Sequence, residues 1–226
     1  MNLSTNTKYR SALAANAARP CNAPGCCHLR VYLEAYCRKH YRPAERHGHP
    51  NASGIQRRAW TPYRTALQAL WALPANAHHD GLVHWTTWAE GLLKKAALDP
   101  SRLSRFSGAA PELIRLAEAG ITGRLILESA VAFGVFTVRN GGRFPSLRAQ
   151  DFAMARAVLQ LAPLPRSASG WTKDLRRGAL VWLGRTLREE LASLVAMTAD
   201  ALEKQAKRDA RTREEVEADR RRPLAI

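Results

Sequence analysis

The sequence has no long apolar run. None of its 226 residues belongs to a segment approaching the roughly 20 consecutive apolar residues that a membrane-spanning helix requires. The first ten residues are polar, unlike the apolar core of a signal peptide. We therefore expect a cytoplasmic protein with no membrane contact. Since 46% of the residues are hydrophobic and 24% are charged, the composition predicts a folded chain with a packed core.

Acidic residues are scarce. The chain has 19 Asp and Glu against 35 Lys and Arg, a formal net charge of +16, and residues 1–65 alone hold 11 basic and 2 acidic residues. A strongly basic protein attracts polyanions, and nucleic acid is the commonest of these. We therefore expect a nucleic-acid partner; DNA is favoured, and RNA is an alternative. The charge would otherwise serve only solubility.

Cysteine is absent after position 37, and all four cysteines lie at Cys21, Cys26, Cys27 and Cys37. The spacing C-x4-C, ten residues, then C-x2-H brings two short chelating loops together. Three thiolates and one imidazole suit the tetrahedral preference of zinc. We predict a structural Zn²⁺ bound by Cys21, Cys26, Cys37 and His40, with Cys27 as the alternative to Cys26. A disulfide is disfavoured, because a cytoplasmic compartment is reducing.

The segment between the ligand pairs alternates in polarity, so residues 31–36 are predicted to form a short strand. Residues 37–46 are predicted to form a short helix, and Pro24 and Gly25 favour a tight turn in the first loop. This layout is typical of a zinc knuckle or a treble-clef-like module.

Residues 21–50 resemble the small zinc-binding segment common in bacteriophage and mobile-element proteins, where it often precedes an HNH endonuclease domain. The shared pattern is C-x4-C, then C-x2-H-Y-x-R and a terminal G-x-P. The sequence has C-x4-C at 21–26, C-x2-H-Y at 37–41 with Arg42 directly after Tyr41, and G-x-P at 48–50. The resemblance implies that the same four ligands bind zinc. It also implies that Tyr41, Arg42 and Arg46 lie beside DNA. It covers only about thirty residues and says nothing of the others.

The sequence departs from the endonuclease members of that family. An HNH site needs a histidine that activates water, together with further ligands for a catalytic divalent metal. After Pro50 the only histidines are His78, His79 and His84, in a helical region rich in Trp and Leu. We therefore expect no enzymatic activity and keep a divergent HNH-type nuclease as an alternative.

The remainder of the chain is predicted to be helical. Residues 1–50 form the zinc module with its N-terminal extension, 51–61 a basic linker, 62–170 a helical body, and 171–226 a long C-terminal helix with a charged tail. Capping residues and prolines predict helices that begin near Thr61, Asp80, Pro111, Thr122 and Ser146. The last helix is predicted to run without a break from position 172 to about 222. The fold class is therefore mainly α.

Two groups of residues are predicted to contact nucleic acid. The first lies in the zinc module and the linker: Arg30, Arg38, Lys39, Tyr41, Arg42, Arg46, Arg57 and Arg58. The second surrounds the Gly141–Gly142 turn: Arg139, Arg143 and Arg148.

Two alternatives concern the helical part. The junction at 119–121 resembles a helix-turn-helix, which would turn Thr122, Arg124 and Glu128 toward a DNA groove. We favour a buried core helix there, because the segment is strongly apolar. In the second alternative the zinc is purely structural, and the protein is an assembly factor of a nucleoprotein complex that binds a protein partner through its C-terminal helix.

Overall fold

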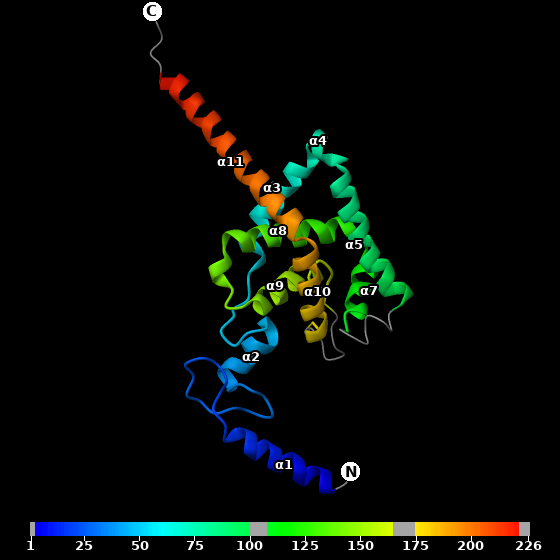
Figure 1. Cartoon of the computed structure of the whole chain (residues 1–226), viewed down its shortest axis with the longest axis vertical. Coiled ribbons are helices and arrows are strands. Elements are labelled where there is room, and N and C mark those ends of the chain that lie inside the picture. Colours follow the sequence, from blue (N-terminus) through cyan, green and yellow to red (C-terminus); the bar gives the residue numbers. More distant parts are fainter. Residues whose placement is uncertain (1–2, 100–107, 165–174, 222–226) are drawn as a thin grey trace, which may run out of the picture.

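A computed structural model describes residues 3–99, 108–164 and 175–221 of the chain (Figure 1). The helices of the N-terminal part are α1 (Leu3–Ala17) and α2 (Arg38–His47). The body contains the short helix η1 (Arg57–Ala59), then α3 (Thr61–Ala72), α4 (Pro74–Ala77), α5 (Asp80–Leu98), α7 (Ala110–Glu118), α8 (Gly123–Arg139), the short helix η2 (Gly141–Arg143), α9 (Leu147–Leu159), α10 (Arg177–Glu190) and α11 (Ala192–Arg221). The predicted mainly α fold class is confirmed.

The predicted strand at 31–36 is wrong. Within the described ranges, the β-type pairing outside helices is a single bridge between Pro20 and Leu29. The segment closes on itself, because the Val31 N–H donates to the Tyr36 carbonyl and the Glu34 N–H donates to the Val31 carbonyl. A strand requires a neighbouring strand to accept its backbone hydrogen bonds, and this segment has none beside it.

Helix α1 was not predicted from the sequence. It carries no apolar stripe, and the side chains of residues 7–12 are exposed. The Asn16 side chain joins its C-terminal end to the cysteine segment, since Asn16 Nδ2 donates to the carbonyl oxygens of Tyr32 and Glu34 at 2.8 Å each.

Local capping explains where several body helices begin. The Thr122 hydroxyl accepts a hydrogen bond from the Leu125 N–H at the start of α8, and the Ser146 hydroxyl accepts one from the Ala149 N–H at the start of α9. Helix α5 differs from the prediction, because Asp80 is its first residue and His79 Nδ1 accepts from the Gly81 N–H as the cap.

Helix α8 forms the centre of the body, with α3, α5, α9 and α11 packed around it (Figure 1). Every residue from Ile126 to Thr137 is buried. The Glu128 carboxylate lies in this helix and is only 7% exposed. It accepts hydrogen bonds from Gln68 Nε2 at 2.8 Å and from Arg124 Nε at 3.1 Å, and it pairs with Arg64. Burial with these partners satisfies the charge inside the protein.

The burial of α8 decides between the two interpretations of the 119–121 junction. Gly120 has a positive φ of 71° and turns the chain between α7 and α8. A recognition helix must present its side chains to a DNA groove, whereas Glu128 is buried and the Arg124 guanidinium lies over the Trp71 ring at 4.6 Å. The core-helix interpretation is therefore confirmed, and the helix-turn-helix alternative is wrong.

The predicted uninterrupted C-terminal helix is also wrong; its expected start at position 172 lies outside the described residues. The helix is interrupted at Leu191, a buried residue that separates α10 from α11. The break lets α10 pack on α9 while α11 crosses α8. The charged tail is as predicted: α11 leaves the body after Leu202, and residues 203–215 are exposed (Figure 1).

Within the part of the chain that the structure describes, no single helix has both the length and the apolar character needed to cross a membrane. The bent pair of α7 and α8 passes that test only when the two helices are taken together, and they are bent by 117°.

Candidate metal centre and basic surface

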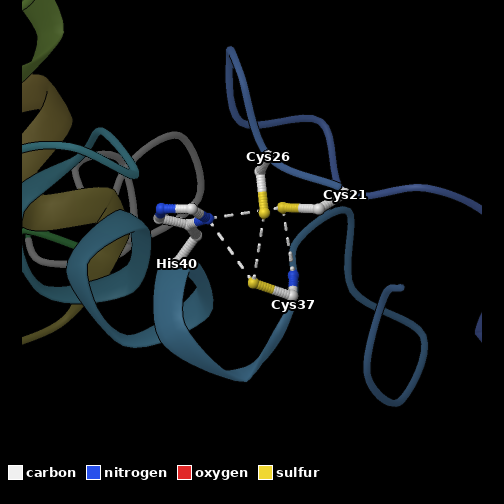
Figure 2. Close-up of side chains that lie close together, drawn as sticks. All are labelled: Cys21, Cys26, Cys37 and His40. Carbon is white, nitrogen blue, oxygen red and sulfur yellow. Dashed lines mark hydrogen bonds between the residues drawn. The ribbon is translucent and has the colours of Figure 1, made fainter. Parts of the chain in front are cut away.

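The structure brings together the four predicted metal ligands. One ligand atom each from Cys21, Cys26, Cys37 and His40 lies within 4.8 Å of the other three (Figure 2). The Sγ atoms of Cys26 and Cys37 are 3.8 Å apart. His40 Nδ1 lies 3.4 Å from Cys37 Sγ and 3.6 Å from Cys21 Sγ.

These separations match the edges of a metal-centred tetrahedron. With metal–sulfur bonds of about 2.3 Å, two sulfurs lie about 3.8 Å apart, and a sulfur and an imidazole nitrogen lie about 3.5 Å apart. The same 3.8 Å separation between Cys26 and Cys37 excludes a disulfide, whose sulfurs would be about 2.0 Å apart. The four residues could therefore hold a metal ion.

The first two ligands flank a tight turn. Gly25 has a φ of 73°, and the Cys26 N–H donates to the Ala23 carbonyl. The Cys21 sulfur accepts two backbone hydrogen bonds, from the Ala23 N–H at 3.4 Å and from the Cys37 N–H at 3.2 Å. These two contacts fix the position of the Cys21 sulfur beside Cys37.

The other two ligands lie at the start of α2. Cys37 is the N-cap residue of the helix, and His40 lies in its first turn. Residues three apart share a face of a helix, so the C-x2-H spacing turns both side chains to the same point. Cys27 lies outside the cluster with an exposed side chain, which answers the question between Cys26 and Cys27 in favour of Cys26.

The pKa values of Cys26 and Cys37, whose sulfurs are 3.8 Å apart, are shifted in opposite directions. Burial by itself would raise the pKa of Cys37, but the backbone N–H groups of His40 and Lys39 lower it, and the net pKa lies below its ordinary value. For Cys26 the backbone of His28 lowers the pKa, while burial and the thiols of Cys37 and Cys21 raise it above its ordinary value. Neighbouring thiolates repel one another, and a bound cation would relieve that repulsion.

The module has almost no apolar core of its own. Its buried cluster consists of Cys21, Ala23 and Cys37, so two of its three members are proposed ligands. It joins the body where α2 ends at Gly48, whose φ is 77°. A Cβ atom there would lie 2.8 Å from Phe152 Cδ2, so the backbone rests directly on α9. Arg156 Nε also donates to the Arg46 carbonyl at 3.0 Å.

Helix α2 has two chemically different faces. At about 100° per residue, His40, Ala44 and His47 lie on one side, whereas positions 38, 42 and 46 lie on the other. Ala44 is buried. The side chains of Arg38, Lys39, Arg42 and Arg46 are exposed. The helix that carries two ligands therefore presents a basic surface to solvent.

Two of the predicted nucleic-acid contacts have partners within the module. The Arg30 guanidinium hydrogen-bonds the Pro20 carbonyl and the side chains of Asn16 and Asn22. Tyr41 is half-buried with its ring edge-on to that of Tyr32. Burial raises the pKa of Tyr41, and a hydrogen bond to Glu45 raises it further.

The remaining predicted contacts are exposed. Arg57 and Arg58 lie on η1, within the linker. The other three lie over aromatic rings: Arg139 over Tyr63 at 5.7 Å, Arg143 over Phe136 at 6.0 Å and Arg148 over Phe152 at 5.8 Å. Stacking holds each guanidinium at the surface without neutralising it.

Sequence reasoning missed two contributors to this region. Asn16 anchors α1 to the cysteine segment, and Arg156 lines a cavity beside the linker. No local pattern marks either residue, because each acts through contacts with residues distant in the sequence.

Comparison of the chain with protein-family models, curated proteins and solved structures finds no match. The resemblance of residues 21–50 to the phage and mobile-element segment therefore stays a prediction.

Proposed function

We propose that this is a non-catalytic nucleic-acid-binding protein whose N-terminal module is held in shape by a structural zinc ion. The observation that carries the proposal is the Cys3His donor set directly beneath α2, whose opposite face carries exposed basic side chains. Zinc fixes the helix, and the helix presents its cations to the phosphate backbone.

The donor set favours zinc and a structural role. Soft thiolates with one imidazole suit zinc, and oxygen ligands, which magnesium and calcium require, are missing from the cluster. Four protein ligands complete a tetrahedron and leave no position for a reacting water molecule. We place the protein in the cytoplasm, where reducing conditions keep thiols available for the metal.

The chemistry of the body argues against the nuclease alternative. His79 caps α5, and the His84 ring packs edge-on against Trp85. These residues lie near α4, at the other end of the molecule from α2 (Figure 1). The side chains of His79 and His84 thus have structural contacts far from the proposed metal. The zinc segment, which resembles that of phage and mobile-element proteins, would here serve binding alone.

Charge supports nucleic acid as the partner, with DNA favoured over RNA. Of the net charge of +16, the largest share lies on residues 1–65, the part that contains the module. Phosphate contacts of this kind position a protein on nucleic acid without reading its sequence.

A salt titration of DNA binding tests the proposal. The double variant Arg38→Gln/Arg42→Gln should weaken binding about tenfold and reduce the slope of log K against log salt by roughly two, because each lost phosphate contact removes about one released counterion. The control Arg208→Gln/Arg211→Gln removes the same charge from the exposed part of α11 and should leave the slope nearly unchanged. Equal effects of the two double variants would contradict the proposal.

One observation favours the assembly role as a second candidate. An apolar cavity of about 730 Å³ lies between α3 and α11, with Pro62, Leu70 and Leu202 among its lining residues. A protein partner bound along α11 would cover it. Negligible DNA affinity at low salt, together with intact zinc binding, would favour this role over the first.

A further inference from the structure

The linker between α2 and α3 forms one wall of a cleft on the body. It runs beside the turn that joins α8 to α9 (Figure 1). Two adjoining cavities of about 130 and 470 Å³ lie here, and both are lined by Ser53, Gly54, Ile55 and Arg143. We call these two cavities together the linker cleft. Its combined volume falls in the range of small-ligand sites.

Basic side chains line the linker cleft. Arg57 and Arg58 contribute from η1 and Arg143 from η2, while Arg156 lies at the inner end. Among the described residues that line the two cavities, none is Asp or Glu. Elsewhere on the body, by contrast, Arg115 and Arg188 are paired with Glu112 and Asp151.

The pKa of His47 reflects the positive charge at the inner end of the cleft. Burial lowers the pKa of its imidazole, and the guanidinium groups of Arg156 and Arg46 lower it further. A cation on His47 is thus disfavoured by its neighbours. An anion in the same place would be favoured by them.

The linker backbone adds hydrogen-bond donors to this charge. Within the described ranges, the backbone N–H groups of Ser53, Gly54 and Ile55 donate no hydrogen bond to the protein. Gly54 lets the chain pass against the His47 ring, because a Cβ atom there would lie 3.1 Å from His47 Cε1. Guanidinium groups next to free backbone N–H groups are the donors that phosphate oxygens accept.

We infer that the linker cleft binds a phosphate group, held by Arg57, Arg58 and Arg143. The inference deepens the proposed function, on which it rests for the source of that group: a phosphodiester of the nucleic-acid backbone. The footprint would then extend from α2 along the linker to the body. Arg139 and Arg148, which the sequence grouped with Arg143, lie outside the cleft.

Two double variants of the full chain with equal charge loss test the inference. Arg57→Gln/Arg143→Gln removes two cations from the cleft, whereas Arg208→Gln/Arg211→Gln removes two exposed cations of α11 that lie outside it. All four side chains are exposed, so both variants should fold, and their circular dichroism melting curves check this. Fluorescence anisotropy with a DNA duplex should show about tenfold weaker binding for the cleft variant and less than about threefold for the control.

A titration with inorganic pyrophosphate tests phosphate binding by the cleft independently of the proposed nucleic-acid binding. At matched ionic strength, pyrophosphate should raise the melting temperature of the wild type and the control, but not that of the cleft variant. If the wild type binds no DNA yet keeps this difference, the proposed function fails and the cleft is a site for a small phosphate ligand. If the cleft variant differs from the control in DNA binding but not in its response to pyrophosphate, the ligand is the phosphodiester of the nucleic-acid backbone. If the two double variants behave alike in both measurements, the inference is overturned.

Discussion

Adjacent cysteines in the module have different environments because the turn that precedes them is closed by a hydrogen bond. The Cys26 N–H donates to the Ala23 carbonyl, and this bond sets the direction in which the Cys26 side chain leaves the backbone. Its sulfur reaches 3.8 Å from Cys37 Sγ, whereas the Cys27 side chain is exposed. Of these two adjacent cysteines, Cys26 is therefore the proposed ligand and Cys27 is not.

Serine substitutions should separate these two cysteines. Cys26→Ser is expected to lose bound zinc on dialysis against a weak chelator, because three remaining ligands hold the ion far less tightly than four. Cys27→Ser is the matched control and should retain about one zinc ion per chain. Atomic emission of the dialysed proteins measures both. If Cys27→Ser lost zinc and Cys26→Ser retained it, Cys27 and not Cys26 would be the ligand.

Helices α9 and α10 approach so closely that one position between them must be glycine. A Cβ atom on Gly184 would lie 1.9 Å from the Asp151 carbonyl oxygen, a backbone atom that cannot rotate away. Arg188, one turn further along α10, donates to the Asp151 carboxylate at 2.7 Å. The contact thus combines close backbone packing with a partly buried ion pair.

Alanine at Gly184 should therefore destabilise the body. We expect Gly184→Ala to lower the free energy of unfolding by about 3 kcal/mol, because α10 must move away from α9. Gly91→Ala in α5 is the control: no atom lies within 4 Å of the added Cβ, and alanine should stabilise that helix by about 0.5–1 kcal/mol. Urea denaturation measures both. A Gly184→Ala protein as stable as the wild type would refute the packing argument.

The helices that the sequence predicted well are those with local signals. Thr122 and Ser146 each cap a helix through a contact three residues away, which a sequence pattern contains. The break at Leu191 has no proline or glycine to mark it, and it follows from packing of α10 on α9 and α11 on α8. Helix α1 lacks an apolar stripe, and the 31–36 segment has the alternation of a strand without a neighbour to pair with.

In the candidate site too, residues marked by local sequence spacing could be predicted, whereas those that depend on tertiary contacts could not. The ligand spacing encodes the cluster, so Cys21, Cys37 and His40 could be predicted directly. The contacts of the Arg30 guanidinium with Asn16 and Pro20 could not be predicted, because they join residues ten or more positions apart. The grouping of Arg143 with Arg57 depends on the tertiary fold, which brings η2 beside the linker.

At the scale of the whole molecule, two cores of very different size lie in one chain. The body core surrounds α8 and includes Phe133, Phe136 and Phe152, all at most 2% exposed. Among the described residues of the module, the buried cluster consists of Cys21, Ala23 and Cys37, with Cys26 and Tyr36 partly buried against it. So small a cluster cannot offset the conformational entropy of an ordered chain, and a bound metal would supply the missing free energy.

Metal removal should therefore unfold one part and spare the other. After chelation, amide hydrogen exchange should accelerate across residues 20–47, while the amides of α8 and α9 keep their protection because their core contains no metal ligand. Cys26→Ser without chelator should reproduce the pattern. Gly48 and Phe152 join the two parts, so exchange at the start of α9 shows how far unfolding of the module spreads. Protection retained throughout the module after chelation would mean that its hydrogen bonds alone suffice, and the structural role proposed for zinc would then be wrong.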